Sequence, residues 1–468
     1  MASKWWTLLV VCLSVFMLLL DVTIVNVALP DIQKDLGSSF EDLQWVVDAY
    51  ALALAALLLA SGSLADLLGR KRVFVVGLIV FVTASLLCGL SGSPTMLNLA
   101  RALQGTGGAM MFATSLALIA QEFPPNERGT AFGIWGATTG FAVAVGPLAG
   151  GALTDGLGWE WIFLVNVPVG ILTAAITLLR VPTSTRDPHA RIDWGGVVTF
   201  SSGLFCLVFA LIRGNDDGWD SAKIVGLLLT AVLLLALFVL IELRRDQAML
   251  DLRLFRVPTF TGAQIVAFSI HASMFSMFLY IVLYMQNVLG YTPLETGVRF
   301  LPVSLLSFVA APIAGKLAER YPVRAFLSAG LGLVGIGLIL MSGIDPGDDW
   351  TTLLPGFILG GIGIGFINPP LATAAIGVVE PRRSGAASGI NSTFRQVGTA
   401  VGIAGLGALL QAKLTHNLDP RSFATPAGRS AYIDAFNDLL LVGAAVALVG
   451  AVLAFALIRR RDFVGAAA

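Results

Sequence analysis

The sequence predicts an all-α polytopic membrane protein: two six-helix bundles and two inserted helices, with fourteen transmembrane helices in total. Composition is the first observation. Hydrophobic residues make up 56% of 468 residues and charged residues only 12%, and the mean hydropathy is +0.85. A soluble protein of this size needs a far more polar surface. The second observation is a series of long apolar runs, and the third is an internal repeat.

Fourteen apolar runs are each long enough to cross a bilayer, which takes roughly 20 helical residues. Hydropathy and the positions of charged and turn-forming residues set the expected start of each span. These starts lie near residues 5, 43, 72, 95, 130, 161, 194, 223, 260, 296, 325, 351, 387 and 434.

The charges of the connections predict the orientation. Of the 29 lysine and arginine residues, most fall in the connections and termini of one side. That side is expected to be cytoplasmic, with both termini on it. No small-residue cleavage site follows the first apolar run, so we expect a retained span in a multi-pass protein of the plasma membrane. The net charge is zero and gives no indication of a nucleic-acid partner.

The chain repeats itself at a shift of 256 residues. Under this shift Gly105 aligns with Gly361, Gly146 with Gly402 and Gly151 with Gly407. We therefore expect a bundle over 1–180, two linker helices within 181–255 and a second bundle over 256–468. Two features occur in one half alone, because the shift aligns Arg101 with Phe357 and Pro147 with Ile403.

The segment 140–151 reads GFAVAVGPLAGG inside an apolar run. Pro147 removes a helical hydrogen bond and bends the helix unless its neighbours compensate. Gly146, Gly150 and Gly151 offer a smooth face on which another helix can pack closely. A kinked packing helix is the alternative reading of this segment; a conformational role in transport is the one we favour.

The loop after the second span reads GSLADLLGRKR over 62–72. Asp66 lies near the end of one helix and Gly69 and Arg70 at the start of the next. An aspartate beside a helix N-terminus is favoured by the helix dipole and can pair with an arginine. We expect Gly62, Asp66, Gly69 and Arg70 to act as a conformational latch, the alternative being a turn with positive-inside charges.

These two segments resemble motifs of the major facilitator superfamily, and the double glycine after Gly146-Pro147 resembles its antiporter motif. Leu67 departs from the loop pattern, where a basic residue is frequent. Further stretches extend the resemblance over the whole chain: 20–30 (LDVTIVNVALP), 101–108 (RALQGTGG), 161–170 (WIFLVNVPVG) and 388–398 (SGINSTFRQVG). Fourteen helices resemble the drug:proton antiporter-2 family. The resemblance implies the major facilitator fold and implicates Arg101 in proton coupling.

Few ionisable residues lie inside the expected spans, and each is costly there and a functional candidate. Asp21, Asp48 and Arg101 fall at similar depth in the outer half of the membrane. Their depths permit one cluster of two carboxylates around one arginine, a site that can gain and lose a proton as access alternates. We expect these three residues to couple transport to protons. A wet interfacial Asp48 and a structural Arg101 are the alternatives.

Other polar side chains within the spans are candidates for a substrate cavity. They are Asn26, Gln104, Tyr280, Tyr284, Asn391 and Arg395. Arg395 could instead pin its helix to the cytoplasmic gate. Residues 386–412 contain no acidic side chain, which argues against dicationic substrates.

The function predicted is proton-coupled antiport that exports hydrophobic or amphipathic small molecules. No phosphate-binding loop, metal constellation or nucleophile elbow occurs in the sequence. We therefore expect a transporter rather than an enzyme, without cofactor or metal, whose partners are a small molecule, protons and the lipid bilayer. A monomer is expected. Export of a lipid or an endogenous metabolite is an alternative, and uptake by proton symport a weaker one.

Overall fold

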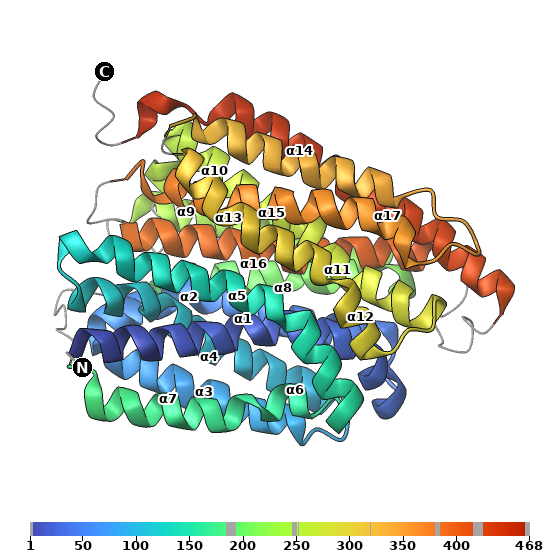
Figure 1. Cartoon of the computed structure of the whole chain (residues 1–468), viewed down its shortest axis with the longest axis horizontal. Coiled ribbons are helices and arrows are strands. Elements are labelled where there is room, and N and C mark those ends of the chain that lie inside the picture. Colours follow the sequence, from blue (N-terminus) through green and yellow to red (C-terminus); the bar gives the residue numbers. More distant parts are fainter. Residues whose placement is uncertain are drawn as a thin grey trace.

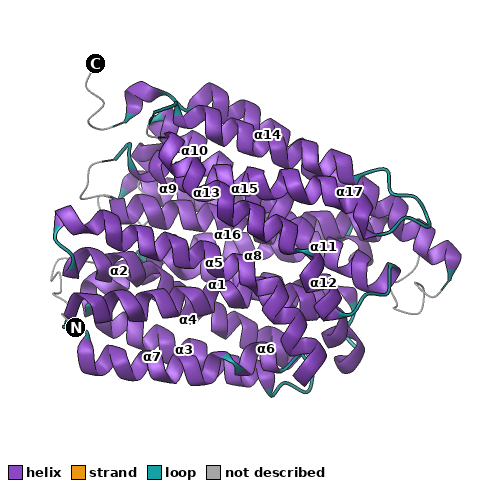
Figure 2. Cartoon of the chain, in the orientation of Figure 1, coloured by secondary structure: helices purple, strands orange, loops and turns teal. Residues whose placement is uncertain are grey.

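The computed structural model describes residues 3–183, 193–245, 250, 252–318, 320–379, 384–414 and 425–463. Throughout these ranges every regular element is helical (Figure 2). The helices lie roughly side by side in one elongated bundle (Figure 1). This confirms the predicted fold class.

The first half of the chain forms six membrane-length units, and two further helices follow it. The first five units are single helices, and the sixth is divided after Leu164. Their bounds are α1 (Ser3–Leu36), α2 (Phe40–Leu68), α3 (Arg70–Gly89), α4 (Pro94–Glu122), α5 (Pro125–Leu157) and the pair α6 (Trp161–Leu164) and α7 (Asn166–Arg180). The linker helices are α8 (Trp194–Asp217) and α9 (Ala222–Arg244).

The second half also forms six units, and two of them are interrupted. One unit joins α10 (Pro258–Ile270), the π-helical segment η2 (His271–Phe275), α11 (Ser276–Leu283) and the π-helical segment η3 (Tyr284–Val288). The next joins α12 (Pro293–Arg299) and α13 (Leu301–Ala318). The remaining units are α14 (Val323–Met341), α15 (Leu354–Ile376), α16 (Ser384–Lys413) and α17 (Pro426–Leu457).

Eleven spans among the described residues are long and apolar enough to cross a membrane. The three other long helices, α2, α5 and α16, contain 29, 33 and 30 residues. Together they account for the fourteen predicted spans. The last helix begins earlier than its expected start near 434, because Thr425 caps it by accepting a hydrogen bond from the Gly428 amide at 3.1 Å.

Close helix contacts at aligned glycines show that the sequence repeat is also a repeat in space. An added Cβ at Gly105 would lie 2.4 Å from the Tyr50 carbonyl oxygen of α2, and one at Gly361 would lie 2.6 Å from the Val303 oxygen of α13. Both glycines let the fourth helix of a half touch the second. Only a residue without a side chain permits such an approach.

The helix termini that the charge pattern predicts to be cytoplasmic lie together at one end of the bundle. Lys4 of α1 pairs with Glu127 of α5. Thr259 at the start of α10 donates a hydrogen bond to the carbonyl of Arg459, just after α17. We call this the inner end and the opposite one the outer end.

Candidate functional site

The centre of the N-terminal half contains a buried ion pair. Arg101 Nη1 of α4 lies 2.5 Å from Asp21 Oδ2 of α1, and the two side chains are 1% and 0% exposed. A pair withdrawn from solvent is stable only with good geometry and further hydrogen bonds, because both charges lose their hydration. The predicted approach of Asp21 and Arg101 is therefore present in the structure.

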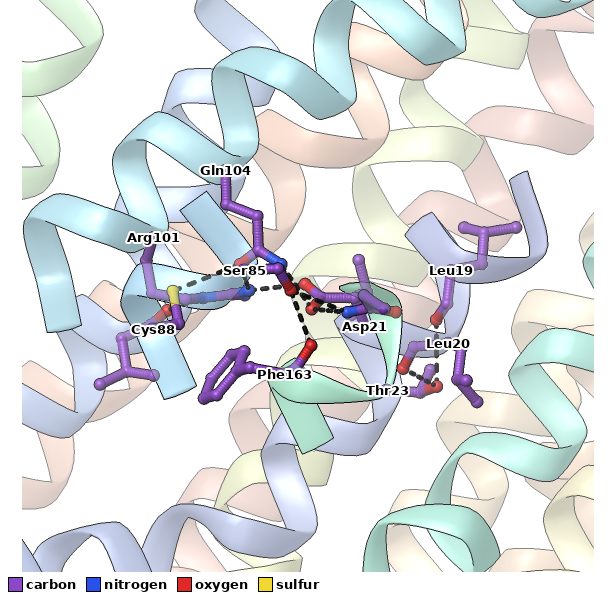
Figure 3. A network of polar contacts seen from close by, with 12 residues as sticks. Leu19, Leu20, Asp21, Thr23, Ser85, Cys88, Arg101, Gln104 and Phe163 are labelled. Carbon is purple, nitrogen blue, oxygen red and sulfur yellow. Dashed lines mark hydrogen bonds and ion pairs between the residues drawn. The ribbon is translucent and has the colours of Figure 1, made fainter. Parts of the chain in front are cut away.

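Neutral polar groups complete the surroundings of Asp21 (Figure 3). Asp21 Oδ1 accepts hydrogen bonds from Gln104 at 2.8 Å and from Asn166 at 3.2 Å. Both amides also donate to the Ser85 hydroxyl, which in turn donates to the Phe163 carbonyl at 3.0 Å. Four elements, α1, α3, α4 and the α6–α7 unit, thus hold one carboxylate.

Helix α2 positions the arginine from the other side. Arg101 Nε donates to the Val46 carbonyl at 2.9 Å, and its guanidinium lies 4.3 Å from the centre of the Tyr50 ring. Residues four apart share a helix face, so Val46 and Tyr50 both face α4. The cation is held by a carboxylate, a carbonyl, the Gln104 side chain and an aromatic face.

Asp48 does not join this cluster, and the expected site of two carboxylates around one arginine is wrong in this respect. Asp48 lies midway between Val46 and Tyr50 in sequence, so it projects from the opposite face of α2. Its side chain is fully buried, and neither carboxylate oxygen has a hydrogen-bond partner among the described residues. It faces the other half of the molecule, because Gln44, one turn earlier on the same face of α2, donates to the Ile403 carbonyl of α16.

Several expected cavity residues are not exposed in this conformation. Gln104 belongs to the Asp21 network, and Tyr280 and Tyr284 are both 0% exposed. The Tyr280 hydroxyl donates to the Ile403 carbonyl, and the Tyr284 ring stacks on Phe436 at 5.1 Å. Both side chains therefore point toward α16 and α17, from a unit in which π-helical segments lie on either side of α11.

The remaining cavity candidates lie on two different helices. Asn26 of α1 is partly buried, and its amide lies 3.5 Å from the Val22 carbonyl. Asn391 of α16 is buried and donates to Gln264 at 3.1 Å. Arg395 is half-buried, and its Nε donates to Asn391 Oδ1 at 3.2 Å.

The glycine face of α5 contacts both halves of the molecule. A Cβ at Gly146 would overlap the Thr23 side chain of α1, and one at Gly150 would lie 2.8 Å from the Ile24 carbonyl oxygen. At Gly151 the neighbour is α12, whose Pro293 oxygen would lie 2.5 Å away. The expected smooth packing face is confirmed, and one end of it lies against the C-terminal half.

Pro147 lies at the same contact between the halves. Its carbonyl oxygen would lie 2.3 Å from a Cβ placed on Gly297 of α12. Proline and glycine thus face each other where α5 crosses α12, and no side chain separates the two backbones.

The loop after α2 is described only in part. The Asp66 side chain lies outside what the structure describes, so the latch remains a prediction. Gly69 has φ 96° and is both the end of α2 and the cap of α3. Arg70 donates to the Ala117 carbonyl of α4 at 3.2 Å, and an added Cβ at Gly62 would meet nothing within 4 Å.

Hydrogen bonds join the two halves at the outer end. Gln286 of η3 donates to the Val27 carbonyl of α1 at 2.7 Å, and Gln44 of α2 donates to the Ile403 carbonyl of α16 at 3.3 Å. Such contacts have to break if the outer end is to open.

Sequence reasoning missed several members of these contacts, including Ser85, Tyr50 and Thr23. Asn166 lay within a quoted motif but was not predicted to touch Asp21. The available signal was a polar side chain in an apolar span, which does not reveal its partner. Across the described residues no group of three metal-ligating side chains lies together.

The site thus consists of a buried ion pair and closely packed glycines within a bundle of membrane-length helices. A sequence model described as the Major Facilitator Superfamily matches residues 11–403 and 265–466. The chain belongs to that superfamily. It is an integral membrane protein, as the apolar spans require.

Several relatives carry names that refer to drug or antibiotic resistance. The chain is 38% identical to the multidrug resistance protein Stp of Mycobacterium tuberculosis, over 88% of this chain and 77% of that protein. It is 36% identical to the puromycin resistance protein pur8 of Streptomyces alboniger, over 98% and 92%. Identity to the tetracenomycin C resistance and export protein of Streptomyces glaucescens is 36%, over 88% and 76%.

Solved structures share the fold. A bacterial homolog of the human lysosomal transporter Spinster, in an inward-facing and occupied conformation, superposes with a TM-score of 0.66 at 18% identity, covering 98% of each chain. The likeness at this identity concerns the fold alone.

Proposed function

We propose that this protein is a proton-coupled antiporter that exports hydrophobic or amphipathic small molecules by alternating access. It would work as a monomer in the plasma membrane, with both termini in the cytoplasm. The observation that carries the proposal is the ion pair of Asp21 and Arg101, buried at 0% and 1% exposure within membrane-spanning helices. A buried pair with both charges satisfied is a site whose energy changes sharply when a proton neutralises the acid.

Protonation of Asp21 would remove the charge that holds Arg101 Nη1. The arginine would keep the Val46 carbonyl and the Gln104 side chain as partners. It could then move toward α2 without losing every hydrogen bond. Two arrangements of similar energy, selected by one proton, are what a two-state transporter needs.

The helix that carries Asp21 is also in contact with α5. Thr23 and Ile24 of α1 pack against Gly146 and Gly150, and Gly151 packs against α12 of the other half. A shift of α1 after protonation would therefore be transmitted through α5 to the contact between the halves. This chain of contacts is the proposed link between proton binding and the closing or opening of the outer end.

Asp48 is proposed as a second proton-binding group. A buried carboxylate without a hydrogen-bond partner is costly when charged, so a proton is expected on it in this closed conformation. The separation of the outer ends would bring it to water and let the proton leave. Export as the direction is supported by relatives named for resistance and export.

The test is substrate-induced proton release from purified protein in detergent. Rhodamine 6G, an amphipathic cation, is added to lightly buffered wild-type protein and to Asp21→Asn. Release is expected from the wild type and not from the variant, while dye binding persists. Asp31→Asn, on the same helix and partly exposed, is the matched control and should release protons as the wild type does.

Transport direction is measured in everted membrane vesicles with an imposed proton gradient. Antiport predicts dye accumulation that a protonophore abolishes, and uptake by symport predicts dye movement in the opposite direction. Undiminished proton release from Asp21→Asn would place the proton elsewhere, and the same assay on Asp48→Asn would then decide whether that group carries it.

A further inference from the structure

Arg395 of the C-terminal half is a cation without an acidic partner among the described residues. It lies in the middle of α16, about 16 Å from the start of the helix at 1.5 Å per residue, and its side chain is half-buried. None of the ion pairs formed among the described residues involves it. An arginine at this depth is expensive unless something pairs with it.

The free edge of the guanidinium is accessible. Among the described residues only Nε has a hydrogen-bond partner, the Asn391 carbonyl oxygen at 3.2 Å. Neither Nη atom is among the fully buried atoms that lack a partner in the described part of the chain, so each keeps some exposed surface. The two Nη groups of an arginine can donate parallel hydrogen bonds to the two oxygens of one carboxylate.

The polar neighbours of Arg395 are neutral and held in place. Asn391 points its carbonyl at Arg395 because its amide donates to Gln264 of α10 at 3.1 Å. His271 Nδ1 lies 3.1 Å from the Thr399 hydroxyl, and that hydroxyl donates to the Arg395 carbonyl. Among the described side chains that face Arg395 from α10 and η2, therefore, none supplies a negative charge.

Aromatic rings lie next to this polar group. The His271 ring stacks on Phe275, with ring centres 4.4 Å apart and planes 11° apart, and Phe278 lies a further 5.6 Å on. All three rings are partly exposed. His271 and Phe275 belong to the π-helical segment η2, a local distortion that is frequent at functional sites.

We propose that Arg395, oriented by Asn391 and flanked by His271 and Phe275, is the subsite that binds the negatively charged group of an aromatic substrate, a carboxylate or an ionised phenol. The proposal rests on the proposed export function and names the substrate class. The ligand would place its acidic oxygens on the Nη edge and its ring against the exposed aromatic faces. The unpaired cation would then gain in the complex the partner that the described part of the chain does not supply.

The experiment compares two dyes that share a xanthene ring and differ in charge. Fluorescein is measured at a pH where both of its acidic groups are ionised, and rhodamine 6G serves as the cation. Binding to protein in lipid nanodiscs is followed by fluorescence anisotropy. Arg395→Gln is expected to raise the Kd of fluorescein about tenfold or more, equivalent to about 1.4 kcal/mol. The Kd of rhodamine 6G should stay equal or fall.

Two further variants keep the test decisive. Arg395→Lys retains the charge without the planar fork, so it should lose only part of the fluorescein affinity. Asn391→Asp places a carboxylate beside the guanidinium, so it should weaken fluorescein binding although Arg395 is still present. Arg299→Gln, which removes a cation lying over Tyr291 at the outer end, is the control and should change neither dye.

The proposal fails if fluorescein affinity is unchanged in Arg395→Gln and Asn391→Asp, if both dyes are lost equally, or if the wild type does not bind fluorescein. If Arg395→Gln does not fold, Arg395→Lys and Asn391→Asp carry the same comparison. Binding in nanodiscs needs no proton gradient. Loss of proton-driven transport with an intact preference between the dyes would therefore count against the export mechanism, and the reverse result against this subsite.

Discussion

The two halves of the molecule share a helix framework and differ in the charges placed on it. Gly146 lets α5 touch the first helix of its own half at Thr23, and the aligned Gly402 lets α16 touch Ser276 of α11 in the same way. At the position of Arg101, however, the second half has Phe357, which is 0% exposed and lies 5.3 Å from the Phe300 ring.

This difference shows that the two halves can keep the same helix contacts while carrying different charged and aromatic side chains. Glycines maintain close helix contacts in both halves. In the first half a buried ion pair lies where the second half has packed aromatic rings. Elsewhere in the second half, Arg395 forms no ion pair with any described residue. We interpret the first half as the proton-coupled one and the second as the one that recognises the substrate.

The largest expected effect is that of Arg101→Ala. It leaves the Asp21 carboxylate buried without its cation, which typically costs about 3–5 kcal/mol of stability. Proton-driven export should be lost. Adding Asp21→Asn to the same protein should recover a large part of the stability but not the export. Thermal unfolding in detergent and dye export in vesicles measure the two quantities.

Phe357→Ala provides the comparison with the other half. Truncation of a buried phenylalanine costs a similar amount, about 3–5 kcal/mol, but removes no titratable contact. Substrate-induced proton release should survive in the folded fraction of this variant. Its loss there would contradict the assignment of coupling to the first half.

The next effect in size concerns the contact between the halves. A leucine at Gly151 would collide with the Pro293 backbone, which cannot move aside as a side chain can. Overpacking typically costs about 1–3 kcal/mol, which corresponds to about a 5–150-fold shift in an equilibrium between conformations. Spin labels at the outer ends of α5 and α12 should report a larger separation, and export should fall.

The matched control is Gly156→Leu on the same helix, since a Cβ there meets nothing within 4 Å. It should export as the wild type does. If Gly151→Leu exports equally well while correctly inserted, the close approach of α5 to α12 has no conformational role.

The smallest effect concerns the linker hairpin, which contacts both halves at the outer end. Arg213 of α8 pairs with Glu41 of α2 at 2.6 Å, and Asn215 donates to the Ala408 carbonyl of α16. Arg213→Met removes a partly exposed pair, which is typically worth about 0.2–1 kcal/mol. Export rates should change by less than tenfold, with the outer end open more often by spin-label distance.

Lys223→Met tests whether this effect comes from the bridge to α2. Lys223 pairs with Asp217 inside the hairpin, so its loss touches neither half directly. If Arg213→Met and Lys223→Met change the export rate equally, the effect comes from the charge of the hairpin and not from the contact with α2.

Sequence reasoning predicted much of the framework and part of the site. Hydropathy predicted fourteen spans, because each helix must present an apolar surface about as long as the bilayer is thick. A long helix lies at each of them, and eleven among the described residues are also apolar enough to cross a membrane. The depth of each residue along its helix predicted that Asp21 and Arg101 lie at the same level of the membrane, and the two side chains form an ion pair. Depth does not give rotation about the helix axis, and Asp48, at similar depth, projects away from the arginine.

The sequence by itself determined the number of helices, the positions of the glycines and proline, and the scarcity of charge within the spans, since these follow from transfer energies and backbone geometry. Only the tertiary structure decided which buried groups are partners. Helix packing places Tyr280 against Ile403 and Tyr284 against Phe436. It also makes Asn166 a partner of Asp21 and gives Arg395 no acid among the described residues. Side-chain pairing depends on helix rotation and crossing, which are set by contacts between segments far apart in the chain.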